Sequence, residues 1–406
     1  MTAVPTTADR AHGLPSRLSA AVDLKLVLWT LFFFVASTAV RSVGELPIQI
    51  AWMLADLAAV VLLFKYQSQF LNIALGNLIF LSWPLLACLS TLWSIAPNLT
   101  FSHGIQLLMT TLVAFLLCIQ LRLKQFVAVF FCALLGAAIV TLASELLSLS
   151  GGSGGDWYGS FPHKNIMGAA MSLLVITALC QFLQGRWRAA SLFAVGLGLF
   201  LVAKSNSAAA VLSLAMTLAA LPFAYAFVRD RTTFSIFLGT ALITAAVGAL
   251  GLYAAMIVVG IDPIDIILAS VGRERTLTGR TLLWDLAEAA IESRPWLGFG
   301  YKAYWTNIPA EMLELVRVVG GVFHFHNNYL DVAVAFGFIG PILLALGVLT
   351  GLVRSLRTLV AGTEPIDAWP FLIVVMVIIL TFVENPLVWN HNMWHVLFIV
   401  VAVIRK

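Results

Sequence analysis

The chain has 406 residues, of which 61% are hydrophobic and only 10% are charged. A soluble domain usually carries about 25% charged residues. A soluble globular protein is therefore excluded, and the excess apolar surface must face lipid. The net charge of +4 is too small to indicate a nucleic-acid partner, and the four cysteines show no zinc-type spacing.

Twelve segments are long and apolar enough, or nearly so, to form the helix of about 20 residues that crosses a bilayer. In chain order they are 24–41, 47–64, 70–93, 100–120, 125–149, 166–184, 188–203, 207–228, 233–260, 328–353, 369–383 and 391–404. These continuous runs are longer than the alternating strands of about 10 residues found in membrane β-barrels. The sequence thus predicts an all-α membrane protein, a bundle of about 12 transmembrane helices.

The domain organisation predicted from these runs is one integral membrane domain. A polar cytoplasmic tail at 1–23 precedes nine transmembrane helices in 24–260. The first of these runs resembles a signal peptide, but we interpret it as an uncleaved span because the loop alternation requires it. A long periplasmic loop at 261–327 follows, and residues 328–406 form transmembrane helices 10–12.

Lysine and arginine indicate the orientation, because cytoplasmic loops are enriched in both. With the N-terminus inside, the cytoplasmic segments contain Arg10, Arg17, Lys25, Lys65, Arg122, Lys124, Arg186, Arg188, Arg229, Arg231, Arg354, Arg357, Arg405 and Lys406. The short outer loops contain only Arg41, Lys164 and Lys204. The pattern predicts a multi-pass protein with both termini in the cytoplasm.

The long outer loop is the extramembrane segment large enough to build a site. Its pattern predicts short helices at 281–293, stopped by Pro295, and at 309–319, ended by glycines. Gly298 and Gly300 between the two helices are typical of a turn. We find no internal repeat.

Cations on the outer face run against the usual bias and indicate an anionic ligand. The candidates are Arg273, Arg275, Arg280 and Lys164. Arg280 stands at the start of a predicted helix, where the partial positive charge of the helix N-terminus adds to a guanidinium suited to phosphate. The alternative is a surface arginine paired with Asp285 or Glu288.

Histidines occur where the long loop enters the tenth predicted span, in His324-Phe325-His326-Asn327-Asn328-Tyr329. A histidine can accept a proton at neutral pH, so His326 is a candidate general base, with Asn327 or Asn328 capping the helix. The alternative is an interfacial histidine beside an aromatic belt that includes Tyr329. His324 and His326 lie on one face, but no third ligand has diagnostic spacing. We therefore expect neither a metal nor a cofactor.

Four acidic residues lie in or beside predicted spans: Asp56, Glu145, Asp331 and Glu384. Ionisable groups at membrane depth are costly and frequently functional. Asp331 or Glu384 could orient a histidine or bind substrate hydroxyls. Acids in spans also fit a proton-coupled transporter, although transporters typically contain repeated halves.

Several motifs in order resemble the O-antigen ligase/polymerase family, most closely its exopolysaccharide polymerase branch. The matching segments are Ser90–Pro97, Phe161–Asn165, Arg280–Trp284, Arg294–Tyr301, His326–Asp331, Gly337–Gly340 and Glu384–Asn385. Each motif alone is weak, but their order and spacing around one long loop are specific. They run from the third predicted span to the twelfth.

The resemblance implies a metal-independent glycosyltransferase that takes a polyprenyl-diphosphate-linked donor. It implies that His326 is the base that activates the acceptor hydroxyl and that Arg280 binds diphosphate. Arg273, Arg275, Lys164, His324, Asn327, Tyr329, Asp331 and Glu384 are the further candidates for substrate binding. One departure is Lys204-Ser205-Asn206-Ser207-Ala208, where members nearer the ligases often carry a Ser-Arg pair. This departure favours the polymerase.

We therefore expect an inverting enzyme of the bacterial inner membrane whose active site faces the periplasm. Its expected partners are a lipid-linked oligosaccharide donor, a glycan or lipid-linked acceptor, membrane lipid and other polysaccharide-assembly proteins, but no nucleic acid. The alternatives are an O-antigen ligase that transfers glycan to lipid A core or a protein hydroxyl, and, in a different class, a glycolipid transporter or flippase. The sequence does not indicate the glycan or the oligomeric state.

Overall fold

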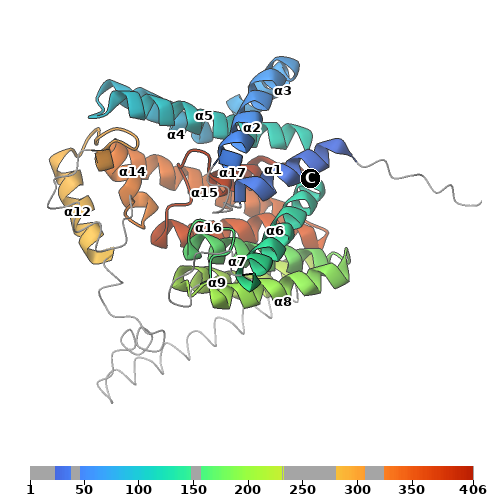
Figure 1. The fold of residues 1–406 in the computed structure, drawn as a ribbon. Helices are drawn as coiled ribbons and strands as arrows, with labels where there is room; N and C mark the ends of the chain where they lie inside the picture. Colours follow the sequence, from blue (N-terminus) through green and yellow to red (C-terminus); the bar gives the residue numbers. More distant parts are fainter. Residues whose placement is uncertain are drawn as a thin grey trace, which may run out of the picture.

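A computed structural model describes residues 23–37, 46–147, 157–230, 232, 280–306 and 324–405. Within these ranges the regular structure is entirely helical, and the helices form one bundle (Figure 1). The prediction of an all-α membrane protein is confirmed. Predictions for other segments, including the ninth span at 233–260 and the helix at 309–319, lie outside the described residues.

Seven helices of the described part are long and apolar enough to cross a membrane. They are α2 (Leu46–Lys65), α5 (Pro97–Gln120), α6 (Leu123–Leu146), α7 (Lys164–Leu183), α9 (Ala208–Arg229), α15 (Ile339–Val360) and α16 (Trp369–Val383), the last lengthened by the turn Pro365–Ala368. Three apolar helices are shorter: α1 (Leu24–Ser37), α8 (Arg188–Lys204) and α17 (Met393–Val403). The predicted number of twelve spans is therefore not reproduced within the described residues.

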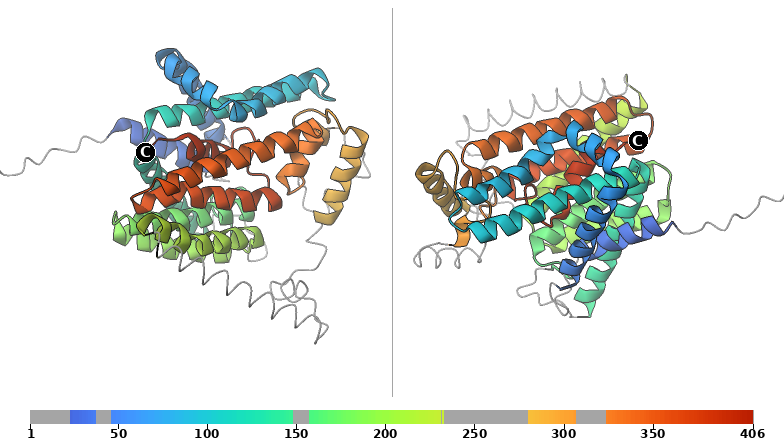
Figure 2. Two further views of the ribbon diagram at one scale, coloured as in Figure 1. Left: turned by 180° about the vertical axis from the view of Figure 1, so that it is seen from behind. Right: turned by 90° about the horizontal axis from the view of Figure 1, so that it is seen from above.

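Helix α7 lies at the centre of the bundle, where α6, α8, α9 and α16 contact it. Most of its side chains are buried, whereas α2 on the outside exposes Leu54, Leu57, Val61 and Phe64. An exposed face of large apolar side chains, such as that of α2, would be unfavourable in water. The exposed side chains of α2 are therefore suited to lipid, and the ribbon views show how the helices are arranged in the bundle (Figure 2).

Loops predicted to be cytoplasmic meet at one end of the bundle. Lys124 Nζ lies 2.7 Å from Glu364 Oε1, and the Leu123 N–H donates to the Arg405 carbonyl at 3.1 Å. Gln184 Nε2 donates to the other oxygen of Glu364. These contacts join the α5–α6, α7–α8 and α15–α16 connections to the C-terminus, as alternating spans require.

The third predicted span, 70–93, is not one continuous helix, although its two pieces together are long and apolar enough for a broken span. Helix α3 (Gln67–Gly76) and the segment that begins with α4 (Leu78–Leu89) meet at an angle of 92°. The break is at Asn77, whose backbone is not helical and whose side chain donates to the Ile73 carbonyl. Arg354 of α15 binds Asn77 and the Gly76 carbonyl, so polar partners satisfy the backbone groups that the break releases.

The tenth predicted span, 328–353, is also broken, into α14 (Asn328–Phe336) and α15. Gly337 between them has a φ of 65°, and a Cβ there would lie 2.3 Å from the Trp296 backbone. Only glycine fits this close approach. The spanning helix therefore begins at Ile339, and α14 is a short helix at the end of the bundle.

The segment after α12 (Arg280–Ser293) packs against this break. The Phe299 and Gly300 N–H groups donate to the Val334 and Ala335 carbonyls at 2.9 and 3.0 Å, and the Phe338 N–H donates to Pro295. The backbone of the motif Arg294–Tyr301 thus pairs with residues on both sides of Gly337, where the motif Gly337–Gly340 begins. The predicted helix at 281–293 and its stop before Pro295 are confirmed.

Candidate active site

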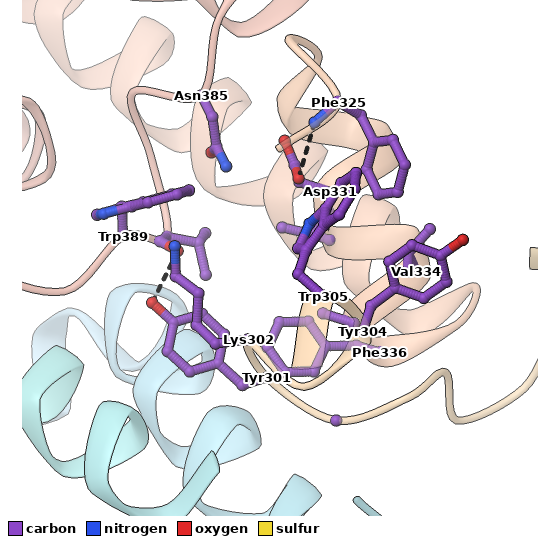
Figure 3. Close-up of a pocket in the computed structure, with 14 residues that line it drawn as sticks. Tyr301, Lys302, Tyr304, Trp305, Phe325, Asp331, Val334, Phe336, Asn385 and Trp389 are labelled. Atoms are coloured by element: carbon purple, nitrogen blue, oxygen red, sulfur yellow. Dashed lines mark hydrogen bonds between the residues drawn. The ribbon is translucent and has the colours of Figure 1, made fainter. Parts of the chain in front are cut away.

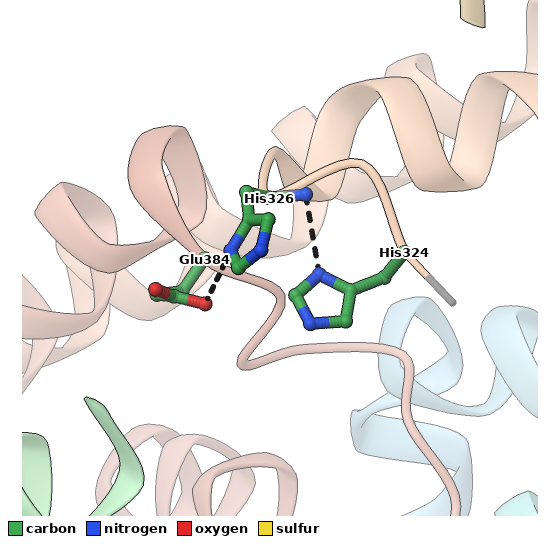
Figure 4. Close-up of side chains that lie close together, drawn as sticks. All are labelled: His324, His326 and Glu384. Carbon is green, nitrogen blue, oxygen red and sulfur yellow. Dashed lines mark hydrogen bonds and ion pairs between the residues drawn. The ribbon is translucent and has the colours of Figure 1, made fainter. Parts of the chain in front are cut away.

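Three elements from different parts of the chain meet at the end of the bundle opposite the basic loops. Helix α12 begins at Arg280, the segment 324–327 leads into α14, and Glu384 follows the last residue of α16. Figure 4 shows His326 between Glu384 and His324. The predicted base and the predicted diphosphate binder are therefore neighbours, joined by one carboxylate.

Glu384 contacts polar side chains through both oxygens. Oε2 lies 3.0 Å from His326 Nδ1. Oε1 accepts from Arg280 Nη2 at 3.3 Å and from Asn165 Nδ2, near the start of α7, at 3.0 Å. Arg280 also donates through Nη1 to the Val383 carbonyl at 2.8 Å. The carboxylate is thus fixed by side chains from three other segments.

The electrostatics of the cluster favour an ionised Glu384. Burial raises the pKa of this carboxyl, but the hydrogen bond from His326 and the nearby charges of His326 and Arg280 outweigh burial and hold the pKa below its ordinary value. Burial has the opposite effect on the pKa of the neighbouring His324. It lowers the pKa of His324 from 6.5 to about 3, helped by His326, so His324 is neutral at physiological pH.

The pairing with Glu384 sets the proton positions on His326. In the neutral tautomer whose Nδ1 donates to the carboxylate, Nε2 carries no proton and could accept one from a substrate. The backbone of His326 is held in the left-handed region, with φ of 50°. Lys302, Val388 and His391 share this conformation nearby. It is unfavourable for non-glycine residues and is concentrated at functional sites.

His324 has a supporting position. Its Nδ1 accepts a hydrogen bond from the His326 backbone N–H at 3.2 Å, and the two ring centroids are 4.2 Å apart. This bond stabilises the strained turn that presents His326. The structure therefore places His324 against the candidate base rather than between Glu384 and Arg280.

His324, His326 and Glu384 each offer a ligand atom, and the three atoms lie within 4.8 Å of one another. The distances alone would allow a metal ion, with Glu384 as the third ligand that sequence spacing did not reveal. The charges do not favour one, because Arg280 and Asn165 already bind the carboxylate and the guanidinium would repel a divalent cation. The donor set fits a hydrogen-bonded base better than a metal centre.

Two asparagines hold the site in place. Asn327 caps α14, because its side-chain oxygen accepts from the Tyr329 and Leu330 N–H groups at 3.0 and 3.2 Å. Asn328 is fully buried and exchanges two hydrogen bonds with the backbone of Leu387. The second pair ties α14 to the loop that carries Glu384. The capping residue predicted as Asn327 or Asn328 is Asn327.

The remaining predicted substrate-binding residues occupy different places. Tyr329 packs against Phe382, with ring centroids 5.3 Å apart. Asp331 accepts from the Phe325 N–H at 3.3 Å through Oδ1, so Glu384 and not Asp331 orients His326. Lys164 begins α7, next to the contacting Asn165. Arg273 and Arg275 lie outside the described residues.

Lys204 lies in the segment that departs from the motif of ligase-like members. Lys204 ends α8, and its ammonium lies 5.3 Å from the Trp157 ring centroid. It is thus positioned by cation–π contact. The described residues that surround Glu384 do not include it.

Two cavities adjoin the cluster. The larger has a volume of about 220 Å³, and its lining residues include Asn165, His324, Glu384 and Trp394. The smaller has about 40 Å³ and is lined by Lys302, Asp331 and several aromatic side chains (Figure 3). Both are lined by Asn385 and Trp389.

Sequence reasoning missed Asn165, Lys302 and Trp389 as site residues. Asn165 belongs to the motif Phe161–Asn165, but the charge of Lys164 made that lysine the predicted substrate-binding residue of the motif. Lys302 immediately follows the motif Arg294–Tyr301, a signal that could have identified it. Nothing in the local sequence distinguishes Trp389 from a membrane-interface tryptophan.

Comparisons with known proteins identify the group to which these features correspond. Residues 169–345 match the family model described as O-antigen ligase. The chain is also 28% identical over 337 residues to the exopolysaccharide production protein ExoQ of Rhizobium meliloti (strain 1021), an alignment covering 78% of this chain and 75% of that relative. The resemblance to the O-antigen ligase/polymerase family is confirmed, and both matches support a polymerase- or ligase-like function in polysaccharide assembly.

Proposed function

We propose that this protein is a metal-independent, inverting glycosyltransferase that polymerises or transfers polyprenyl-diphosphate-linked oligosaccharide units on the periplasmic face of the inner membrane. One observation carries the proposal. His326 is oriented by the Glu384 carboxylate at 3.0 Å. Beside it lies Arg280, a side chain suited to binding phosphate, which contacts the same carboxylate at 3.3 Å.

His326 acts as the general base. Its Nε2 takes the proton of an acceptor hydroxyl while that oxygen attacks the anomeric carbon of the donor sugar. The bond from this carbon to the diphosphate oxygen breaks, and the lipid diphosphate leaves with the electron pair. Glu384 keeps the imidazole in the required orientation and stabilises the imidazolium. A single displacement inverts the anomeric carbon.

Arg280 serves the leaving group. A diphosphate is stable as an anion, so the protein mainly needs to position it and screen its charge. The guanidinium has five donors in a planar fork, and its contacts with Val383 and Glu384 fix the direction of that fork. Arg280 can therefore bridge the carboxylate that orients the base and the diphosphate of the donor.

The orientation proposed for the active site rests on the basic loops. Residues Lys124, Gln184 and Arg405 mark one end of the bundle, and Glu384 with its partners marks the other. Cytoplasmic loops carry the excess of lysine and arginine, so the cluster is on the periplasmic side. A lipid tail would remain in the bilayer while its diphosphate reaches Arg280.

Two features favour polymerisation over ligation to lipid A core. The relative with 28% identity is named for exopolysaccharide production. In addition, the segment Lys204–Ala208 lacks the arginine that ligase-like members often carry, and Lys204 is paired with Trp157.

A glycolipid transporter is the alternative of a different class. Its support is the pair of broken spans, since transporters use broken helices near the midplane. Here, however, the break at Asn77 binds Arg354 in the second half of α15, whereas the break at Gly337 precedes the start of α15. The two breaks lie at different depths and do not face each other.

The test uses purified protein in lipid nanodiscs with a polyprenyl-diphosphate-linked oligosaccharide as donor. We expect products of two or more joined units from this donor alone, detected by mass spectrometry, with release of polyprenyl diphosphate. Products that form only when lipid A core is added would identify a ligase. If no glycosidic bond forms while the donor crosses a bilayer in proteoliposomes, the protein is a transporter and the proposed enzymatic function is wrong.

A further inference from the structure

The larger cavity lies beside the carboxylate that orients His326. Glu384 and His324 form the part of its wall next to the catalytic cluster, and Asn165 and Ile166 near the start of α7 form another part. Ile166 is 46% exposed, so the cavity opens at the molecular surface. A ligand can therefore enter this cavity and lie against the residues proposed to carry out the transfer.

Two amide side chains of the wall each keep one atom for a ligand. Asn165 donates through Nδ2 to Glu384, which leaves its Oδ1 as an acceptor, and Asn392 caps α17 through Oδ1, which leaves its Nδ2 as a donor. Within the described part of the chain neither of these two atoms has a hydrogen-bond partner, and neither is shielded from solvent. The wall therefore offers one accessible acceptor and one accessible donor.

Much of the remaining wall is apolar and aromatic. Trp389 and Trp394 line the cavity together with Leu380 and Pro386. His324 meets the Trp389 ring edge to face, with centroids 5.9 Å apart. Flat aromatic surfaces beside a few placed polar groups are typical of small-molecule sites. A sugar ring matches this wall, because it has apolar C–H faces and a rim of hydroxyls that both donate and accept.

A lipid tail would suit the cavity less well. An isoprenoid chain has no hydrogen-bonding group, so it would displace water from Asn165 Oδ1 and Asn392 Nδ2 and leave both atoms unpaired, which is unfavourable. The size of the cavity is sufficient for a sugar. A water molecule needs about 10–15 Å³ of such volume, so about 220 Å³ holds one ring with its hydroxyls.

The charge of the wall disfavours anions. Burial raises the pKa of the Glu384 carboxyl, but the hydrogen bond from His326 and the nearby charges outweigh burial, so Glu384 is ionised. Burial lowers the pKa of His324 to about 3, so this imidazole adds no positive charge. No lysine or arginine is among the described residues that line the cavity. Glu384 would therefore repel a carboxylate or a phosphate bound there.

We propose that the larger cavity is a subsite for one uncharged sugar ring of the glycan, which lies against the two tryptophans and pairs its hydroxyls with Asn165 and Asn392. The ring belongs either to the donor, next to its diphosphate at Arg280, or to the acceptor, and both sources present the same chemistry. The role of this ring in transfer rests on the proposed function, but the sugar site itself does not.

Binding is tested by saturation-transfer NMR on the purified full-length protein in nanodiscs of zwitterionic lipid, with empty nanodiscs as the blank. The probes are methyl glucoside, galactoside and mannoside and the three matching methyl uronides. We expect at least one hexoside to give a signal above the blank and its matching uronide to give a signal about threefold weaker or less, because Glu384 repels the added carboxylate. Equal signals from such a pair, or no signal from any hexoside, would overturn the proposal.

Variants place the sugar in this cavity. Ala169 of α7 also lines it, and Ala169→Leu should fill part of the space and reduce the hexoside signal about threefold or more. Asn392→Ser keeps an oxygen that can cap α17 but lacks Nδ2. It should weaken the signal likewise, and it decides the matter if Ala169→Leu does not fold. Ala219→Leu, on the exposed face of α9, is the matched control and should bind as wild type. Wild-type signals from both cavity variants would refute the site.

Inhibition of turnover identifies the source of the ring, with a lipid-free oligosaccharide as acceptor. A hexoside that competes with the donor occupies the position of the donor sugar, and one that competes with the acceptor occupies that of the acceptor sugar. Either result supports the proposal, whereas a hexoside that binds but competes with neither would contradict a subsite beside Glu384.

Binding and turnover also separate this inference from the proposed function. Hexoside binding that is lost in Ala169→Leu, in a protein without transferase activity, would keep the sugar site and reject the enzyme. Transferase activity without hexoside binding would reject the sugar site and keep the enzyme.

Discussion

Glu384 is the residue that connects the groups of the site. Its Oε2 orients His326, and its Oε1 holds Arg280 and Asn165. Four segments that are remote in sequence thus depend on one side chain for their relative placement. A substitution that removes its charge but keeps its shape and its hydrogen-bonding capacity should affect catalysis more than folding.

We expect Glu384→Gln to lower kcat on the order of 10²–10⁴-fold, the contribution of a correctly oriented base. The amide can present N–H to His326 Nδ1 and favour the wrong tautomer, without a large change in shape. Steady-state transfer by the purified variant measures this. Glu288→Gln, exposed on α12, is the matched control, and equal rates for the two variants would show that Glu384 does not support the base.

The buried His324 predicts a pH dependence of stability. Its pKa is lowered from 6.5 to about 3 in the fold, so the unfolded chain binds the extra proton more readily between these values, and stability falls as pH decreases below about 6.5. The loss is at most about 1.4 kcal/mol per pH unit. Thermal unfolding between pH 7 and 5 should show a smaller decline for His324→Gln than for wild type, and identical slopes would contradict the assignment.

Single residues were predictable from the sequence where their chemistry is distinctive. His326 and Arg280 were singled out by residue type and by their places at a helix start and a loop end, and the structure brings them to one carboxylate. Asn165 and Trp389 were not, because an amide or an indole acquires a role only from what the fold places opposite it. Glu384 was a candidate beside Asp331 for orienting a histidine, but the choice between the two was not predictable, because Glu384 lies 58 residues from His326 and no local pattern applies at that separation.

At the scale of elements, the break between α14 and α15 positions the turn that carries His326. Gly337 has φ of 65°, and a Cβ would lie 2.3 Å from Trp296 C and 2.4 Å from its carbonyl oxygen. Gly337→Ala should therefore destabilise the protein by about 1–3 kcal/mol and lower activity. Thermal unfolding in detergent provides the measurement.

The control for this variant is Gly196→Ala within α8, where an added Cβ meets nothing within 4 Å. Alanine is favoured over glycine in a helix by about 1 kcal/mol, so this variant should be as stable as wild type or more so. A Gly337→Ala protein with wild-type stability would mean that the break does not require glycine.

Hydropathy predicted which segments are apolar but not where helices break. The breaks at Asn77 and Gly337 depend on tertiary partners, Arg354 for the first and the Pro295–Gly300 backbone for the second. A long apolar run satisfies a hydropathy window whether or not its helix is continuous. The pairing of the Arg294–Tyr301 backbone with residues on both sides of Gly337 explains two of the recognised motifs as backbone packing.

At the scale of the whole molecule, the topology remains a prediction. In a background without the native cysteines, Trp296→Cys should react with a membrane-impermeant maleimide on intact spheroplasts, because this side chain is 74% exposed at the end that carries the site. Arg357→Cys should react only after permeabilisation. Labelling of Arg357→Cys in intact spheroplasts, with Trp296→Cys protected, would show that the bundle has the opposite orientation and that the site faces the cytoplasm.

The central claim is that His326 is the base of a glycan transfer, and its most direct test is the single-turnover rate of glycosidic bond formation by His326→Ala beside His324→Ala. We expect His326→Ala to be at least about 10²-fold slower than wild type with normal donor binding, and His324→Ala, which only steadies the turn through the His326 N–H, to lose less. Added chelator should change neither rate. A wild-type rate for His326→Ala would contradict the account.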